Sequence, residues 1–381
     1  MEFKTSISMS TTEDGPRTLL LGIISPRNRA TNPQDYLEEF VNLVETLGVE
    51  YSKTWFTKLR EIDKAHFLTK GKREELVKLC AEHQIGQIIC SESLSPLQQR
   101  KLEDITECKV VDRMQLIIEI FKNAATSAEG RIQVEMAEIE LLKTRLSGQG
   151  IEMSQQMGGI GEKGPGETYK EMVYRILKTR YAAAKKKLDV LQKSRDVQRK
   201  MRVESETPLV CLVGYTNAGK SSVLNAVTQS EVLVENKLFA TLDTTTRTFF
   251  CDNRKILMAD TVGFISELPH HLVAAFKSTL SELKYASVLL HIIDIHNPAW
   301  KDHIRVVNET LGDLEIDANT PVIHVFNKAD LMTAEQLEYL EIDLLQYKPY
   351  VLCSTLSKEG IADVLELLAN TLKVVAPAKK K

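Results

Sequence analysis

The chain has 381 residues, of which 43% are hydrophobic and 27% charged, and its formal net charge is −3. This length allows two or three domains with sizeable cores, and the composition is that of an ordinary soluble globular protein. Every apolar run falls short of the roughly 18 residues of a membrane span, so we expect no membrane insertion. The six cysteines are widely spaced without a C-x-x-C pair. This spacing favours reduced core thiols in a cytosolic protein over disulfides or a metal site.

The N-terminal part of the chain predicts a parallel α/β domain. Residues 1–17 are polar and include acidic side chains, unlike a signal peptide, and we expect them to be a disordered lead-in. Between residues 18 and 125, short apolar runs alternate with helix-periodic stretches, a pattern that is typical of a parallel sheet. Lys70-Gly71-Lys72 precedes one of these helical stretches. The α/β pattern and these lysines permit a second nucleotide site in this domain, although its sequence has no glycine fingerprint.

Residues 126–204 predict a long antiparallel helical hairpin. The apolar residues of 129–146 repeat with a period near 3.5, residues 168–202 are also helical in pattern, and a glycine-rich stretch at 158–166 lies between them. The second helix is strongly basic: it contains Lys170, Arg175, Lys178, Arg180, Lys185, Lys186, Lys187, Lys193, Arg195, Arg199, Lys200 and Arg202. A solvated helix face and a contact with nucleic-acid phosphates both fit this charge. Because few aromatic residues are interleaved, the second reading favours folded RNA over single strands.

The stretch that opens the third region, 205–375, predicts a phosphate-binding loop. The apolar run 209–213 indicates a buried strand and 222–227 a helix. Between them lies G-x-x-x-x-G-K-S, formed by Gly214, Tyr215, Thr216, Asn217, Ala218, Gly219, Lys220 and Ser221. The glycines let backbone N–H groups close around phosphate oxygens. Lys220 would reach the β- and γ-phosphates and stabilise charge during transfer, and Ser221 would hold Mg²⁺.

A second motif follows the apolar run 254–259 and consists of Asp260, Thr261, Val262 and Gly263. A carboxylate at this strand end can hold Mg²⁺ through water, and the Gly263 N–H can bond the γ-phosphate, so this loop can sense hydrolysis. D-x-x-G is common by itself. Its place behind an apolar strand, downstream of the phosphate loop, makes it informative here.

A third motif, N-K-x-D, follows the apolar run 320–326 and consists of Asn327, Lys328, Ala329 and Asp330. The Asp330 carboxylate can accept two hydrogen bonds from guanine that adenine cannot offer, so the motif predicts GTP and GDP as ligands rather than ATP. We expect Asn327 to brace the phosphate loop and the stem of Lys328 to cover the base. Ser354 and Thr355 follow the last predicted strand, where a backbone N–H would meet the guanine O6.

The first switch should lie between residues 236 and 248. It includes Phe239, Ala240, Thr241, Leu242 and Asp243, followed by three more threonines at 244–246. One threonine must give its hydroxyl to Mg²⁺ and its N–H to the γ-phosphate. Residue chemistry alone does not choose among the four.

Together with the glycine-rich stretch 158–168, these motifs resemble the HflX family of ribosome-associated GTPases over residues 18–372. The N-terminal part of the chain also matches the family at Leu94-Ser95-Pro96 with Gln99, at Val111-Asp112-Arg113 and at Gln133-Val134-Glu135. The resemblance implies an α/β N-terminal domain, the hairpin, a Ras-like G domain and a short basic tail at 376–381. It also implies a monomer that binds the large ribosomal subunit and its rRNA when loaded with GTP, and members that split stalled ribosomes. By the same resemblance Thr241 joins Ser221 and Asp260 as a Mg²⁺ ligand, and Lys220, Thr241 and Gly263 serve catalysis.

Several features leave alternatives open. Phe264 stands where Ras-type enzymes carry a water-orienting glutamine, so it is either simply packed or a sign that the ribosome or an ion completes the site. Asn217 resembles the loop asparagine of potassium-stimulated GTPases, but it could equally brace the loop. Thr244 and Thr355 replace a proline and an alanine found in many members, and contacts of an extra C-terminal domain are in doubt. A GTPase in large-subunit assembly and a GTP-gated RNA-binding module with little turnover remain alternative functions.

Overall fold

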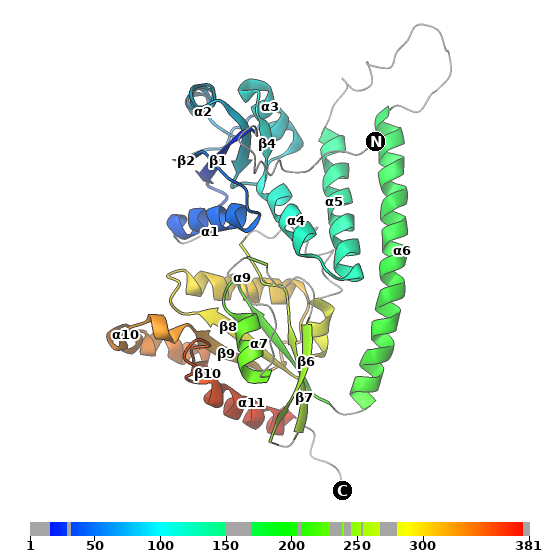
Figure 1. Cartoon of the computed structure of the whole chain (residues 1–381), viewed down its shortest axis with the longest axis vertical. Helices are drawn as coiled ribbons and strands as arrows, with labels where there is room; N and C mark the ends of the chain where they lie inside the picture. Colours follow the sequence, from blue (N-terminus) through cyan, green and yellow to red (C-terminus); the bar gives the residue numbers. More distant parts are fainter. Residues whose placement is uncertain are drawn as a thin grey trace. The chain divides into compact units, whose positions relative to one another are not determined.

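The computed structural model describes residues 16–28, 32–148, 169–204, 207–228, 238–239, 245–252, 254–266 and 280–375. Its contacts divide the chain into two compact units, shown together in Figure 1. One unit comprises residues 1–123 and 131–190, and the other comprises residues 124–130 and 191–381.

The first unit contains the predicted parallel sheet. Its four strands lie in the order β2-β1-β3-β4, and every neighbouring pair is parallel. They are β1 (Arg17–Ile24), β2 (Lys53–Lys58), β3 (Ile85–Cys90) and β4 (Lys109–Val111). The helices between and after them are α1 (Pro33–Thr46), α2 (Lys70–His83), α3 (Pro96–Thr106) and α4 (Arg113–Ala124). The predicted α/β fold class of this region is confirmed.

Alternation along the strands explains why helices cover both faces of this sheet. Leu19, Leu21 and Ile23 of β1 pack in one core with α2 and α3. Gly22 faces the other side, where an added Cβ would collide with Leu37 of α1 and with Phe56. Because both faces are buried, the strands read in the sequence as continuous apolar runs rather than as alternating ones.

The hairpin helices are α5 (Ala128–Gly148) and α6 (Tyr169–Glu204). Ile139 and Leu146 of α5 pack against Val173 and Leu177 of α6, and further along Met136 contacts Ala184 and Leu188. These apolar contacts hold the two helices together. The glycine-rich stretch at 158–166 lies outside the described residues.

The second unit is built on a six-stranded sheet in the order β10-β9-β8-β5-β7-β6, in which only β6 runs antiparallel to its neighbour. The strands are β5 (Leu209–Gly214), β6 (Thr245–Cys251), β7 (Arg254–Asp260), β8 (Val288–Asp294), β9 (Val322–Asn327) and β10 (Tyr350–Leu352). The helices are α7 (Lys220–Thr228), α9 (Trp300–Asp313), α10 (Ala334–Leu344) and α11 (Ile361–Val375). Short 3-10 turns occur at η2 (Ser281–Tyr285), η3 (Ala329–Leu331) and η4 (Leu345–Tyr347).

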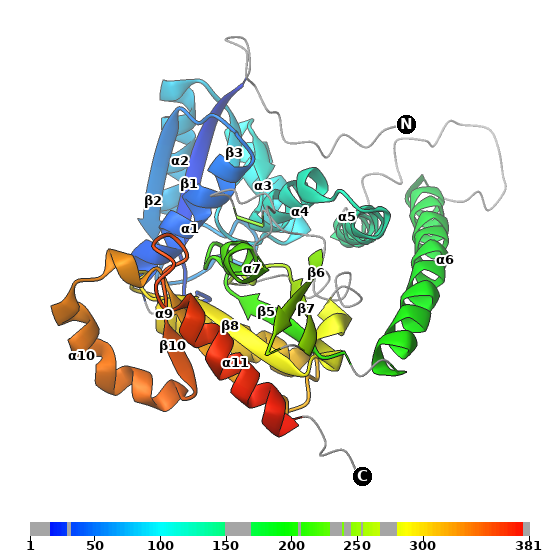
Figure 2. The same cartoon turned by 60° about the horizontal axis from the view of Figure 1, so that its bottom comes forward.

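Helices α7 and α11 share one core with the sheet, and α9 and α10 pack on its other face (Figure 2). In such a sheet the carboxyl ends of the parallel strands meet at one edge, which is where ligands bind in α/β folds. Three predicted motifs follow β5, β7 and β9 directly. The topology therefore brings them to the same edge.

Two further observations concern the chain as a whole. Among the described residues, no helix is long and apolar enough to cross a bilayer. The cysteines are free thiols, buried except for the half-buried Cys251.

Candidate nucleotide site

The phosphate loop begins at Gly214, a position at the end of β5 that only glycine can occupy. A Cβ on Gly214 would collide with the carbonyl oxygen of Ile292 on the neighbouring strand. Gly219, at the start of α7, has a φ of +95°, and a Cβ there would collide with the side-chain amide of Asn327. The two glycines of the motif thus permit two close approaches, one to β8 and one to the N-K-x-D motif.

Lys220 lies folded over the loop that precedes it. Its Nζ donates to the carbonyl oxygens of Tyr215 at 2.8 Å and Gly214 at 3.2 Å. Burial lowers the pKa of Lys220 to about 8, and the negative charge of Asp260 opposes this shift only in part. A buried ammonium with two neutral acceptors is poorly compensated. The dianionic or trianionic phosphate of a nucleotide would supply the charge that this site lacks.

The two predicted Mg²⁺ ligands from separate motifs are in direct contact. Ser221 Oγ donates to Asp260 Oδ2 at 2.6 Å, and Asp260 is fully buried at the end of β7. Next to it, Thr261 donates its hydroxyl to the carbonyl oxygen of Leu212 at 2.6 Å, which ties this loop to β5. A hydroxyl beside a carboxylate is the oxygen donor set that suits Mg²⁺. The residues present therefore fit the ion that the motif implies.

Asn327 connects three loops of the site. Its Nδ2 donates to the carbonyl oxygen of Ala218 at 3.0 Å, and its Oδ1 accepts the backbone N–H of Thr355 at 3.2 Å. The expected brace between Asn327 and the phosphate loop is present in this geometry. Ser354 stabilises the adjoining turn, since its Oγ accepts the N–H groups of Leu356 and Ser357.

The neighbouring lysine has a partner that sequence reasoning missed. Lys328 Nζ lies 2.6 Å from Asp294 Oδ2, and the backbone of Lys328 has a φ of +62°. Asp294 ends β8 beside Asn327 at the end of β9, and its other oxygen accepts the N–H of His296 at 3.1 Å. The signal in the sequence was an acid directly after an apolar strand, as at Asp260. Asp330 follows within η3, and its side chain is exposed.

The loop after Asp260 is paired to the phosphate loop by backbone bonds. Thr216 N–H donates to Phe264 O at 2.8 Å, and Phe264 N–H donates to Gly214 O at 3.1 Å. Val262 is buried, and the side chain of Phe264 is 1% exposed. Phe264 is thus packed in the core and cannot orient a water molecule.

The remaining predicted residues divide into two groups. Asn217 is exposed in the phosphate loop with a φ of +60°, and Phe239 of the first switch is buried with a φ of +57°. Ala240, Thr241, Leu242 and Asp243 lie outside the described residues. The choice of Thr241 among the four threonines therefore stays a prediction.

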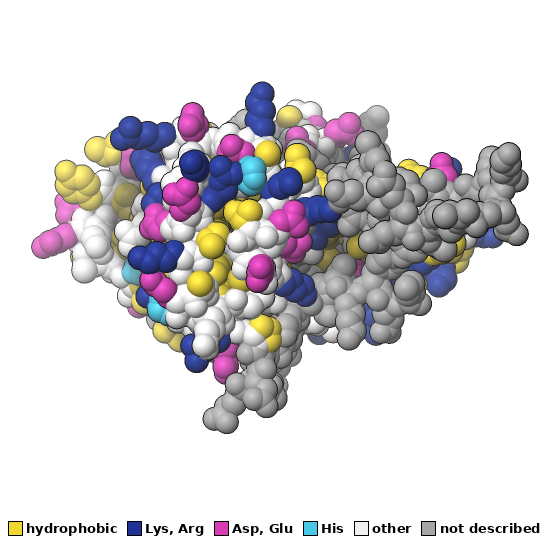
Figure 3. All heavy atoms as spheres, turned by 90° about the horizontal axis from the view of Figure 1, so that it is seen from above, with side chains coloured by type: hydrophobic (Ala, Val, Ile, Leu, Met, Phe, Trp, Pro, Cys, Tyr) yellow, Lys and Arg dark blue, Asp and Glu magenta, His cyan; other side chains and the backbone are white. Residues whose placement is uncertain are grey.

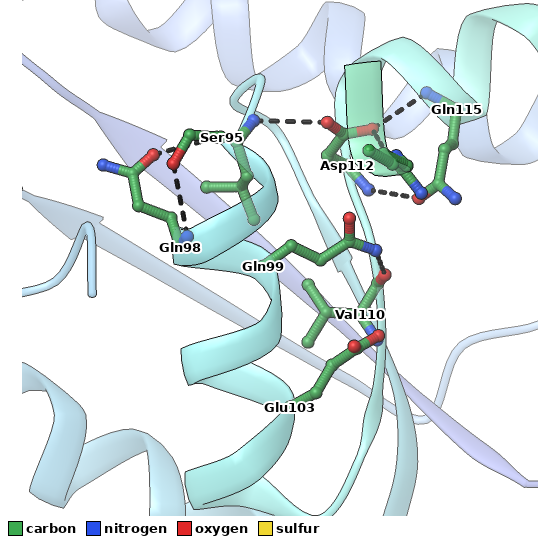
Figure 4. A network of polar contacts seen from close by, with 9 residues as sticks. Ser95, Gln98, Gln99, Glu103, Val110, Asp112 and Gln115 are labelled. Atoms are coloured by element: carbon green, nitrogen blue, oxygen red, sulfur yellow. Dashed lines mark hydrogen bonds and ion pairs between the residues drawn. The ribbon is translucent and has the colours of Figure 1, made fainter. Parts of the chain in front are cut away.

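Residues of two other HflX-like motifs, around Ser95 and Asp112, lie in a polar network of the first unit (Figure 4). The buried Asp112 accepts the N–H groups of Gln115 at 2.9 Å and Leu94 at 3.2 Å, and Arg145 of α5 at 3.1 Å. Burial raises the pKa of Asp112, and the Arg145 guanidinium opposes this. Gln99 donates to Val110 O at 2.6 Å. These residues attach α5 to the end of β4, so they have a structural role in the first unit.

Comparison with known proteins decides the family. Three family models match in chain order: "GTP-binding GTPase N-terminal" over 34–122, "GTP-binding GTPase Middle Region" over 124–202 and "50S ribosome-binding GTPase" over 209–328. The GTPase HflX of Caldanaerobacter subterraneus is 44% identical over 320 residues, which cover 84% of this chain and 74% of that protein. The chain belongs to the HflX family of GTPases. HflX proteins of Flavobacterium psychrophilum and Escherichia coli are 42% and 40% identical, over 82% and 78% of this chain and 75% and 70% of their own.

Among solved structures, the chain is similar to a GTP-binding protein from Sulfolobus solfataricus in complex with GDP. That protein is 22% identical, with a TM-score of 0.46, over 94% of this chain and 100% of that one. Membership of the HflX family makes the chain a GTP-hydrolysing enzyme, as the motifs predict. Its P-loop GTPase domain implies the Mg²⁺ dependence that is usual for such enzymes.

Proposed function

We propose that this HflX GTPase binds the large ribosomal subunit in its GTP state and splits stalled ribosomes into subunits. The observation that carries the proposal is the outer face of α6. Val173, Leu177, Ala184 and Leu188 are buried on the inner face. The exposed residues include Arg175, Lys178, Arg180, Lys185, Lys186, Lys187 and Lys193.

This face is long and predominantly basic, although the exposed Glu171 and Asp189 also lie on α6. A helix of 36 residues extends for about 54 Å. Arg180 pairs with Glu135 at 3.1 Å, but both side chains are largely exposed, so the pair is weak and leaves Arg180 able to contact phosphates. In the view of Figure 3, by contrast, the coloured basic and acidic side chains are interspersed. A predominantly basic helical stripe is typical of a protein that contacts the nucleic-acid backbone. The family model described as a 50S ribosome-binding GTPase points to rRNA.

The nucleotide would control this contact through two loops, the first switch and the loop from Asp260 to Gly263. Ser221, Asp260 and Thr241 would hold Mg²⁺, Asp330 would read guanine, and the Gly263 N–H would bond the γ-phosphate. GTP then favours one arrangement of the two loops, and hydrolysis removes the contact that held it. Such a cycle couples ribosome binding to GTP and release to GDP.

We also propose that K⁺ accelerates hydrolysis through Asn217. The exposed position of this residue in the phosphate loop leaves its side chain accessible to an ion beside the phosphates. GTP turnover should therefore be faster in KCl than in NaCl at equal ionic strength, and Asn217→Ala should remove the difference. Equal rates of the unaltered protein in both salts would contradict this role.

Sedimentation of intact ribosomes tests the main proposal. With a non-hydrolysable GTP analogue, the protein should convert intact ribosomes to subunits and migrate with the large one. A triple Lys185/Lys186/Lys187→Glu variant should lose this effect and retain GDP binding. A control with the same charge change at the exposed Lys255, Lys348 and Lys358 should keep it.

Sedimentation, together with GTP turnover measured with and without ribosomes, separates the alternative functions. Binding to immature large subunits without splitting would favour an assembly factor. Tight GTP-dependent binding without ribosome-stimulated turnover would favour a binding module. No splitting with GTP or its analogue would reject the proposal.

A further inference from the structure

Thr216 has a buried hydroxyl that the structure does not use. The residue is 7% exposed, and its Oγ1 is enclosed without a hydrogen-bond partner among the described residues. Its backbone N–H is occupied by Phe264 O. A buried hydroxyl without a partner loses its hydration and gains nothing in return. Such a group in a ligand site indicates a bond that forms only with the ligand.

The position of Thr216 indicates which part of the ligand its hydroxyl would contact. A Cβ built on Gly263 would lie 2.9 Å from both Cα and Cγ2 of Thr216 and 3.0 Å from Lys220 Nζ. The Thr216 side chain is therefore adjacent to Gly263 and Lys220, the two groups expected at the γ-phosphate. Its methyl group faces Gly263. Rotation of χ1 to another staggered rotamer exchanges the methyl and the hydroxyl.

The site also lacks a polar side chain where Ras-type enzymes have one. Phe264 follows Gly263 and is packed in the core with 1% exposure. It can neither donate to the γ-phosphoryl group nor orient water. A donor for the charge that develops during hydrolysis must come from elsewhere. The side chain of Thr216 lies beside Gly263 and Lys220, and its buried hydroxyl has no hydrogen-bond partner among the described residues.

We propose that Thr216 is a catalytic residue whose hydroxyl donates a hydrogen bond to a γ-phosphoryl oxygen in the transition state. The inference rests on the nucleotide site of the proposed function. In the reaction, the oxygen of water bonds to the γ-phosphorus while the bond to the β–γ bridging oxygen breaks. The electron pair of that bond leaves with GDP, and the water proton passes to phosphate. Thr216 keeps its proton throughout and acts only as a donor, an interaction that strengthens as charge develops.

Two substitutions separate the hydroxyl from the shape of the side chain. Thr216→Val keeps the volume and removes the donor, and Thr216→Ser keeps the donor and removes the methyl group. We expect Thr216→Val to lower the single-turnover rate at saturating GTP by about tenfold to a hundredfold, the usual cost of a charge-assisted donor. GDP affinity should be unchanged in both variants, and Thr216→Ser should hydrolyse GTP at nearly the unaltered rate.

A transition-state analogue supplies the second readout. GDP with aluminium fluoride should bind the unaltered protein and Thr216→Ser, and should bind Thr216→Val much more weakly. Unaltered hydrolysis by Thr216→Val, or an equal loss in the Val and Ser variants, would overturn the proposal. GDP binding and its loss in Lys220→Ala test the nucleotide site itself, so a failure there is distinguished from a failure at Thr216.

Discussion

The hydroxyl of Tyr215 lies 2.7 Å from both the Oγ and the backbone nitrogen of Ser266. The ring of Tyr215 is stacked on His303 of α9, with 3.7 Å between ring centroids. Tyr215 therefore joins the segment after Gly263 to α9, which packs on the face of the sheet opposite α7. Sequence reasoning placed Tyr215 among the nucleotide contacts, and this geometry gives its side chain a second role in positioning the loop that senses hydrolysis.

Removing the Tyr215 hydroxyl should weaken this link without removing the ring. We expect Tyr215→Phe to lower the free energy of unfolding by about 1 kcal/mol, because the Ser266 N–H and hydroxyl lose a partner. Urea denaturation of the nucleotide-free protein measures the change. Tyr339→Phe is the matched control, because Tyr339 is 90% exposed. If both variants unfolded at the same urea concentration as the unaltered protein, the Tyr215 bond would be of no consequence for stability.

The Lys328–Asp294 pair should act through the position of the lysine stem. Asp294→Asn is expected to weaken GDP binding by about threefold to tenfold, since one charge-assisted bond that holds Lys328 is reduced. In a Lys328→Ala background the same substitution should have no further effect. Titration calorimetry of the four proteins gives the coupling directly. Additive losses would show that Asp294 acts independently of Lys328, and Asp343→Asn, which alters an exposed pair with Lys301, serves as the control.

Nucleotide binding should take up protons above neutral pH. Burial places the pKa of Lys220 at about 8 in the nucleotide-free protein, and phosphate oxygens would favour the ammonium and raise this pKa on binding. Lys220 is mostly charged below pH 8, so affinity should be nearly constant there. Above pH 8 the free protein must first bind a proton, so affinity for GDP should fall as pH rises.

Calorimetry of GDP binding in two buffers of different ionisation enthalpy measures this uptake. Proton uptake should be small at pH 7 and should rise toward one proton as the pH passes above the free-protein pKa of about 8, because the bound nucleotide holds the pKa of Lys220 higher. The absence of uptake at pH 9 would contradict the low pKa of Lys220.

Three histidines, the buried His291 and the half-buried His303 and His324, should make the second unit sensitive to acid. Burial lowers the pKa of His291 to about 3 and of His303 to about 4, and it also lowers the pKa of His324. The unfolded chain binds protons near pH 6.5 at each of these rings, and the folded protein does not. The stability is therefore complete above pH 6.5 and is lost as pH falls below it, by up to about 1.4 kcal/mol per pH unit for each ring.

The measurement is the unfolding free energy between pH 7.5 and 5. His291→Phe should reduce the slope of the unfolding free energy against pH. The His291 ring binds a proton only in the unfolded chain, and the phenyl ring binds none. His296→Gln, at an exposed position, should leave the slope unchanged. A flat profile for the unaltered protein would show that these rings are protonated equally in both states.

The sequence by itself determined the features that are local in the chain. The phosphate loop needs glycines at two positions and a lysine and a serine beside them, so eight consecutive residues are enough to predict phosphate binding. Asp260 and Asn327 could be placed in the same way, because parallel strands end at one edge of the sheet. The basic stripe of α6 and its apolar partner face follow from helical periodicity.

Only the tertiary structure decided which distant side chains meet. Asp294 and Lys328 are brought together by adjacent strands, and Tyr215 reaches Ser266 and His303 through packing that no local pattern specifies. The same holds for Thr216, which in the sequence is one variable position of a motif. Its buried hydroxyl beside Gly263 and Lys220 is a property of the folded loops, because burial and hydrogen-bond satisfaction depend on all neighbours at once.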